Sequence, residues 1–292
     1  MTTYQYHVDG ELVPAERATV NVRDRGFMYG DAAFETIRVY GGQPFEWEAH
    51  ASRLRRTCET LGFADAVPPT TDLRERVEET ITANSLADAS VKLSISRGVQ
   101  PGKLTPDDQV DPTVVITISA LPRAGVGGER VWDGPASLSL VDRQRAPEKA
   151  IPAAAKTHNY LTGILARLEL RGTDHDEAIM CSSDGFLTEG ATSNLFFVVG
   201  ERLFTPSVDL PILPGVTRGV VLSLADEAGI PIETGRYTPE SLEQATEVFV
   251  TNSTWEIRPV TRIDEYSFEV GPITSELTTR FDETVETFYF GT

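Results

Sequence analysis

This sequence is poor in lysine and cysteine, and it has no long apolar run. Only four of its 26 basic residues are lysines, so arginine supplies nearly all of the positive charge. The two cysteines, Cys58 and Cys181, lie far apart in the sequence and imply neither a disulfide framework nor a metal cluster. Two isolated thiols fit a reducing compartment, and we expect a cytoplasmic protein.

The absence of a long apolar run excludes further classes of protein. No stretch approaches the length of a transmembrane helix, and residues 1–10 lack the charged-then-apolar pattern of a signal peptide. We therefore expect no membrane association. The hydrophobic fraction of 40% is enough to fill a sizeable interior, and a length of 292 residues favours two domains.

The charge is strongly one-sided, with 26 basic residues against 44 acidic ones and a net charge of −18. Such a surface repels nucleic acid and anionic lipid. The acidic residues are scattered and form no block, which argues against a surface shaped for a cationic partner. Scattered acids with few lysines favour a halophilic protein, because a salt-rich cytoplasm screens the repulsion between like charges.

The first part of the chain alternates strand and helix patterns. Hairpin signals at residues 9–10 and 41–42 are each flanked by strand patterns. Beyond them the pattern predicts helices at 48–62 and 72–84 and strands at 91–97 and 113–120. All periodicity then stops, which predicts a small N-terminal domain at 1–122 and a linker at 123–130.

The remaining residues, 131–292, predict a larger domain of the same mixed kind. The predicted strands are 137–141, 177–181, 194–199, 202–205 and 247–251. Helices are expected after residue 160, after Leu213-Pro214-Gly215 and at 272–288. The fold class is therefore α+β with two domains of unequal size.

One of the four lysines, Lys156, follows three alanines in the segment 153–160. Lysine is the basic side chain that loses its proton when it is desolvated, and it can then act as a nucleophile or a base. The alternative is a solvated lysine that contributes surface charge only.

Two further segments could bind phosphate. Gly215-Val216-Thr217-Arg218 opens a predicted helix and can present free backbone N–H groups and a hydroxyl to an anion. Thr251-Asn252-Ser253-Thr254 follows a strand and can add hydroxyls and amides. The structural alternatives are an ordinary turn and ordinary capping residues.

Glu189 lies among small residues just before an apolar strand, so we expect it to be partly buried and to need a partner. A pyridine nitrogen would be such a partner, because the carboxylate would hold it protonated and let the ring accept electrons. The alternative is a capping or ion-pairing glutamate.

A desolvated lysine, a carboxylate for a ring nitrogen and a phosphate cradle are together what pyridoxal 5'-phosphate requires. The sequence resembles the class IV aminotransferases, which are fold-type IV pyridoxal-phosphate enzymes. The matching segments are residues 25–31, 34–38, 50–54, 156–161, 189–196, 213–218 and 251–260. They span nearly the whole chain in the family's order and spacing, which favours the functional interpretation of each one.

The resemblance implies a role for each matching residue. Lys156 would form the Schiff base with the cofactor and then move the proton at the substrate carbon. Glu189 would pair with the pyridine nitrogen, and Tyr160 would approach the phenolic oxygen. The phosphate would be bound by Arg53, Val216, Thr217, Ser253 and Thr254. The family's site lies between the small and the larger domain, near the interface of a homodimer.

Substrate contacts implied by the resemblance fall on Tyr29, Arg38, Arg97 and Lys103. Here the chain departs from the family pattern, because Gly102 stands where an arginine for the substrate carboxylate is usual and Leu104 stands where D-specific enzymes often carry a histidine. The carboxylate of the small-molecule amine substrate would then be bound by Lys103, Arg38 or Arg97.

Three details favour one branch of the family. The spacing Lys156-x-x-Asn159, the segment 189–194 and Thr251-Asn252-Ser253 resemble aminodeoxychorismate lyases more than branched-chain transaminases. We predict an aminodeoxychorismate lyase-like enzyme that forms p-aminobenzoate and pyruvate for folate biosynthesis. The alternatives are a branched-chain or D-specific amino-acid:2-oxoacid transaminase and, from another class, a non-enzymatic phosphate-binding module.

Overall fold

The computed structural model describes residues 4–290, which fall into two compact units. Unit 1 contains residues 4–124, 155–159 and 287–290, and unit 2 contains residues 125–154 and 160–286. The sequence assigned residues 131–292 to one domain. The structure groups the Lys156 segment and the last described turn with unit 1. The order of residues along the chain does not reveal this grouping, because it depends on long-range strand pairing.

Unit 1 is built on a six-stranded antiparallel sheet of order β2-β1-β6-β5-β3-β4. Its strands are β1 (Gln5–Val8), β2 (Glu11–Pro14), β3 (Ala32–Tyr40), β4 (Gln43–Pro44), β5 (Ala89–Ser96) and β6 (Val114–Ala120). Both predicted hairpins are present, and each turn uses two residues of positive φ, at 9–10 and 41–42.

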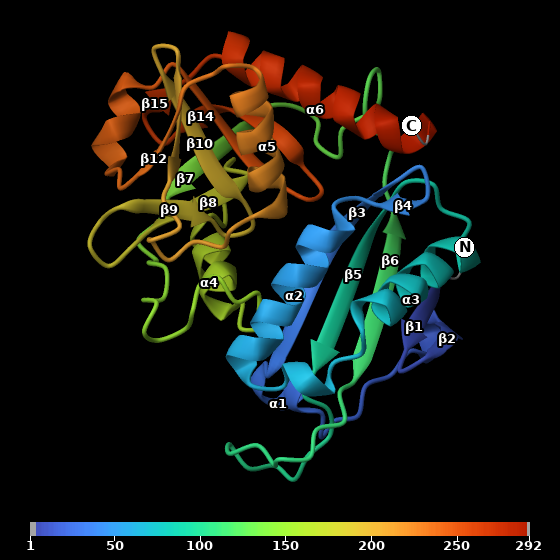
Figure 1. The fold of residues 1–292 in the computed structure, drawn as a ribbon. Coiled ribbons are helices and arrows are strands. Elements are labelled where there is room, and N and C mark those ends of the chain that lie inside the picture. Colours follow the sequence, from blue (N-terminus) through green and yellow to red (C-terminus); the bar gives the residue numbers. More distant parts are fainter. Residues whose placement is uncertain (1–3, 291–292) are drawn as a thin grey trace. The chain divides into compact units, whose positions relative to one another are not determined.

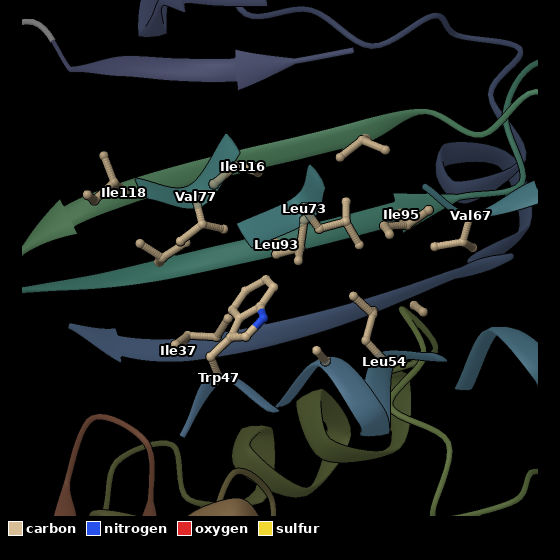
Figure 2. Close-up of a cluster of buried hydrophobic side chains, with 14 of the residues drawn as sticks. Ile37, Trp47, Leu54, Val67, Leu73, Val77, Leu93, Ile95, Ile116 and Ile118 are labelled. Carbon is tan, nitrogen blue, oxygen red and sulfur yellow. The ribbon is translucent and has the colours of Figure 1, made fainter. Parts of the chain in front are cut away.

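Two long helices, α2 (Trp47–Leu61) and α3 (Thr70–Ala83), cover one face of this sheet (Figure 1). The short helix α1 (Arg25–Tyr29) precedes β3, and single 3-10 turns lie at Ala15–Arg17 and Ala64–Ala66. Figure 2 shows the resulting core, in which Leu54 and Val77 from the helices face Ile37, Leu93 and Ile116 from the strands. Burial of alternate residues in β5 and β6 fixes the register of these two strands, and β3, which pairs with β5, is buried along nearly its whole length.

Unit 2 is built on a nine-stranded mixed sheet of order β12-β11-β10-β13-β14-β7-β8-β9, with β15 paired to β14. Its strands are β7 (Ala136–Leu140), β8 (Glu177–Cys181), β9 (Leu187–Gly190), β10 (Asn194–Val199), β11 (Arg202–Pro206), β12 (Ile232–Gly235), β13 (Glu247–Asn252), β14 (Glu256–Ile263) and β15 (Tyr266–Ser267). Because β9 also pairs with β10, the strands from β10 through β14 and β7 to β9 close into a ring.

The helices of unit 2 are α4 (Leu161–Glu169), α5 (Val216–Glu227) and the 3-10 helix η3 (Pro239–Gln244). The last helix, α6 (Pro272–Phe290), runs from unit 2 into the residues that group with unit 1. No helix among the described residues is long and apolar enough to cross a membrane.

We expect Gly98 to be indispensable to the fold of unit 1. It has a φ of +86°, and a Cβ placed there would lie 1.8 Å from the carbonyl oxygen of Asp111. Gly98→Ala should therefore lower the free energy of unfolding by about 2 kcal/mol or more, because backbone overlap adds to left-handed strain. Urea unfolding followed by circular dichroism measures the loss.

Gly62→Ala is the matched control for this prediction. Gly62 also has a positive φ, +76°, but its Cβ position has no atom within 4 Å. It should lose only about 1 kcal/mol. Equal losses in the two variants would contradict the role assigned to the Asp111 carbonyl.

Candidate functional site

The backbone of Lys156 is fixed by strand pairing within unit 1. Its carbonyl oxygen accepts a hydrogen bond from the Phe34 N–H (3.0 Å), and the His158 N–H donates to the Ala32 carbonyl (2.9 Å). The Lys156 N–H donates to Thr57 Oγ1 on α2 at 3.0 Å. The segment therefore pairs with β3 at the edge of the sheet, and this pairing fixes the backbone from which the Lys156 side chain extends.

The Lys156 side chain meets the ring of Phe34, and a second lysine meets the same ring. Lys156 Nζ lies 4.5 Å from the ring centroid and Lys92 Nζ lies 4.6 Å from it. Burial, and then the charge of Lys156, lower the pKa of Lys92. A charged amine over an aromatic face is stabilised by the ring, so Phe34 holds both amines in one place.

A neutral imidazole completes this group. The His158 ring packs edge-on against Phe34 at 5.5 Å, and its Nε2 lies 3.3 Å from Ser94 Oγ. Burial and the charge of Lys92 lower the pKa of His158 to about 4, so the imidazole is neutral at neutral pH. Lys92 was missed at the sequence level. The sequence does show that Lys92 is one of only four lysines and that it lies in a predicted strand. The pairing of β5 with β3 was needed to show that it lies near Lys156.

Arg53, the predicted phosphate ligand, is held in a buried ion pair. Arg53 Nε and Nη2 donate to the two carboxylate oxygens of Glu35 at 2.8 and 2.6 Å, and His50 Nδ1 lies 2.7 Å from the same carboxylate. Burial alone would raise the pKa of Glu35, but the hydrogen bonds and charges of Arg53 and His50 outweigh it and lower the pKa to about 2. The hydrogen bonds from Nε and Nη2 to Glu35 thus orient the guanidinium of Arg53. Its contact with a phosphate stays a prediction.

Two of the predicted substrate residues, Arg38 and Arg97, are buried and held by other groups. Arg38 Nη2 donates to the Pro122 carbonyl at 2.6 Å, and Arg97 Nε donates to Asp31 at 2.7 Å. Their exposed fractions are 2% and 6%. Arg38 Nε and Nη1, however, have no hydrogen-bond partner among the described residues, and the substrate roles of both arginines stay predictions.

The other two predicted substrate residues, Tyr29 and Lys103, are linked through Arg25. The Arg25 guanidinium lies 5.1 Å from the Tyr29 ring centroid and donates to the carbonyl oxygen of Lys103 at 2.6 Å. It also pairs with Asp31 at 2.7 Å. The Lys103 side chain is exposed on its loop. Arg25 was not predicted as a site residue, although it anchors the loop that carries Lys103.

In unit 2, Glu189, Asn194 and Thr251 stand side by side on three neighbouring strands. Glu189 on β9 pairs in register with Asn194 on β10, which pairs with Thr251 on β13. Glu189 Oε2 accepts hydrogen bonds from Asn194 Nδ2 (3.1 Å) and the Leu213 N–H (2.9 Å). Its Oε1 lies 2.9 Å from Arg145 Nη2. The expected buried carboxylate is present, at 5% exposure, with a cation that the sequence did not identify.

The N-terminus of α5 lies next to the same asparagine. Gly215 is the N-cap, no side chain caps this end, and a Cβ at Gly215 would lie 2.0 Å from Asn194 Oδ1. Only glycine allows this approach. The first amides of the helix, including those of Val216 and Thr217, have no partner within the helix, and the helix dipole favours an anion there.

The segment 251–254 folds around Asn252. Asn252 Oδ1 accepts hydrogen bonds from the Thr254 N–H (3.0 Å), the Thr254 hydroxyl (3.1 Å) and the Trp255 N–H (2.7 Å). Among the described residues, the buried hydroxyl of Thr251 has no hydrogen-bond partner. A buried hydroxyl without a partner together with uncapped helix amides fits an anionic phosphate. Ser253 is half-buried.

The predicted site residues therefore fall in both units. Lys156 and Arg53 belong to unit 1, whereas Glu189 and the predicted phosphate residues of α5 and 251–254 belong to unit 2. Tyr160 is the half-buried N-cap of α4. In the part of the chain that the structure describes, no cluster of acidic, histidine or cysteine side chains could hold a metal ion.

Comparisons with known proteins give a consistent result over the whole chain. Residues 32–263 match the model of the amino-transferase class IV family. A putative branched-chain-amino-acid aminotransferase of Methanocaldococcus jannaschii is 35% identical over 95% of this chain and 95% of that protein. An aminodeoxychorismate lyase of Bacillus subtilis is 33% identical over 93% of this chain and 91% of that protein. A branched-chain aminotransferase of Thermoproteus uzoniensis, crystallised with norvaline, matches with a TM-score of 0.87 at 29% identity, covering 99% of this chain and 96% of that one.

The Glu35 ion pair predicts a specific pH dependence of stability. Glu35→Gln leaves Arg53 without its buried carboxylate, so it should lower the free energy of unfolding by roughly 3–5 kcal/mol at pH 7. Because folding lowers the pKa of Glu35, its contribution is complete above the ordinary value of 4.5 and is lost as the pH falls toward about 2. The difference between wild type and variant should therefore shrink between pH 5 and about pH 2.

Urea unfolding at a series of pH values measures this difference. Glu48→Gln is the control, because Glu48 lies on α2, the helix that carries Arg53, and its side chain is 85% exposed. It should change stability by less than about 0.5 kcal/mol. A Glu35→Gln loss that does not depend on pH would contradict the ionised pair.

Proposed function

This chain belongs to the class IV aminotransferases, enzymes whose cofactor is pyridoxal 5'-phosphate, and on that premise we propose that it is an aminodeoxychorismate lyase. The proposed reaction converts 4-amino-4-deoxychorismate to p-aminobenzoate and pyruvate. The observation that carries the pyridoxal-phosphate chemistry is Lys156, whose amine lies with a second amine over the ring of Phe34, next to a neutral histidine. The choice of the lyase rests on the motif Thr251-Asn252-Ser253. Membership of this family sets aside the non-enzymatic phosphate-binding module.

When bound, pyridoxal 5'-phosphate supplies an aldehyde that condenses with an amine and a ring that accepts an electron pair. Lys156 Nζ holds the cofactor and then takes the proton from the substrate carbon that bears the amino group. As that C–H bond breaks, the bond from the neighbouring ring carbon to the enolpyruvyl oxygen also breaks, and the ring becomes aromatic. Lys156 returns the proton to the methylene carbon of the departing enolpyruvate, which becomes pyruvate.

The remaining residues bind and orient. Glu189 would pair with the pyridine nitrogen, and the N-terminus of α5 would bind the phosphate together with Thr217, Ser253 and Thr254. The uncapped end of α5 and the open Thr251 hydroxyl support this assignment. Arg53 would add a positive charge, and its guanidinium is oriented by the ion pair with Glu35.

The substrate carboxylate is assigned to the lysines of unit 1. Lys92 lies over the same ring as Lys156, whereas Arg97 is buried and paired with Asp31. Lys103, on the loop beside Tyr29, is the second candidate. A lysine on a flexible stem binds a carboxylate as a point charge and without the fixed geometry of an arginine.

A transaminase of branched-chain or D-specific type is the alternative, and the 35% identity to a putative branched-chain enzyme favours it. Proton removal by Lys156 serves both reactions. The substrate's leaving group then decides between elimination and transfer of the amino group. The Lys156-x-x-Asn159 spacing is typical of both lyases and D-amino-acid transaminases and argues against the branched-chain type only. The motif Thr251-Asn252-Ser253 favours the lyase over the branched-chain type.

We also propose a homodimer that works in a salt-rich cytoplasm. The support is the net charge of −18 and the exposed apolar side chains of Phe27 and Leu104, which are 74% and 79% exposed. Light scattering over a range of salt concentrations tests both parts. A monomer at every concentration would contradict the dimer.

Lys156→Ala should abolish turnover. Loss of the amine removes both the covalent attachment and the base, so kcat should fall by roughly 10³-fold or more. Borohydride reduction of the wild-type holoenzyme should fix the cofactor on Lys156, as peptide mass spectrometry will show. Lys149→Ala, which removes an exposed lysine, should leave both results unchanged.

Product analysis separates the lyase from the transaminase. Purified enzyme with 4-amino-4-deoxychorismate should release pyruvate and p-aminobenzoate in equal amounts without an added 2-oxoacid. Glutamate formation that requires both an amino-acid donor and 2-oxoglutarate, with no p-aminobenzoate, would sink the lyase assignment and support the alternative.

A further inference from the structure

Arg145 forms an ion pair with the buried carboxylate of Glu189, and the proposed mechanism gives this arginine no role. It lies between β7 and α4, outside any helix or strand. Its backbone N–H donates to the Cys181 carbonyl at 3.0 Å, and its Nε donates to the Pro211 carbonyl at 3.1 Å. These two bonds fix the arginine from both ends, so the guanidinium reaches Glu189 with little freedom.

The two oxygens of Glu189 have different partners. Oε2 accepts from two neutral donors, Asn194 Nδ2 and the Leu213 N–H, whereas Oε1 lies 2.9 Å from the Arg145 guanidinium. Opposite charges at this distance attract strongly where water is largely excluded. The attraction favours the ionised form of the Glu189 carboxylate.

Arg218 is a second cation whose charge interacts with Glu189. Its guanidinium, however, donates to the Pro206 carbonyl at 3.1 Å and to Thr205 Oγ1 at 3.4 Å. Arg145 is therefore a direct ionic contact of Glu189, whereas Arg218 interacts with it electrostatically and donates its hydrogen bonds elsewhere.

We propose that Arg145 is a positioning residue that keeps Glu189 ionised, so that the proton shared with the cofactor's pyridine nitrogen stays on the ring. This inference rests on the proposed role of Glu189. The reason is electrostatic. A cation close to the carboxylate stabilises the pair of charged pyridinium and carboxylate over the neutral pair in which the proton has moved to Glu189. Only the protonated ring accepts the electron pair efficiently.

The test follows the ring nitrogen directly. Protein reconstituted with ¹⁵N-labelled pyridoxal 5'-phosphate is studied by ¹⁵N NMR as wild type, Arg145→Gln and Arg145→Lys. In Arg145→Gln the ring resonance should move toward that of unprotonated pyridine, and kcat should fall by roughly 10–100-fold with a smaller change in KM. Arg145→Lys restores the charge and should return the resonance toward wild type.

Arg143→Met is the matched control. Arg143 is two residues away, its side chain is 48% exposed, and it pairs with Glu169 at 3.5 Å. It should leave the resonance and kcat unchanged. A wild-type ring resonance in folded Arg145→Gln overturns the proposal. If that variant does not fold, an unprotonated ring in Arg145→Lys overturns it equally.

The outcome also distinguishes this inference from the proposed function. If wild-type protein takes up no cofactor, the proposed function itself fails. If wild type shows a protonated ring that does not respond to the charge at residue 145, the proposed function stands and only the role of Arg145 is lost.

Discussion

The pairing of residues 156–158 with β3 is the constraint on which the chemistry of unit 1 depends. It converts an irregular connection into an edge of the sheet, with hydrogen bonds from Phe34 and to Ala32 on either side of Thr157. Strand β3 is itself held by β5 and by the core under α2, so the backbone of Lys156 is held as firmly as the sheet. A lysine side chain has several rotatable bonds, so a fixed backbone is what makes its amine a usable base.

Arginine and lysine are used differently in this chain. Arg25, Arg53, Arg97 and Arg145 each contact a carboxylate and at least three of them lie in buried or nearly buried surroundings. The planar guanidinium suits such fixed pairs, because it keeps its charge and donates in two directions. Lys92 and Lys156 both lie over the ring of Phe34. Burial lowers the pKa of Lys92, so its amine responds to its environment.

Much of this arrangement was predictable from the sequence. The family, the two-domain α+β class and the cofactor were predicted from ordered motifs, and the comparisons confirm them. Local signals such as the glycine turns and the helix that follows Gly215 reflect short-range chemistry, which is why they could be predicted. The grouping of residues 155–159 with the first unit depends on a partner more than a hundred residues away, and no local pattern encodes that distance.

The assignments that the sequence could not make share one physical cause. Arg38 and Arg97 were predicted as candidates for the substrate carboxylate because Gly102 stands where the family usually has an arginine. The structure shows that backbone carbonyls and Asp31 contact them, and their substrate roles stay predictions. The sequence did not identify Lys92 and Arg145 as site residues. Each is linked to the site only by a contact with a residue on another strand, Phe34 for Lys92 and Glu189 for Arg145. A residue type therefore predicts which chemistry is possible. Whether the charge is already compensated is decided by tertiary contacts, and it is this compensation that separates a binding cation from a structural one.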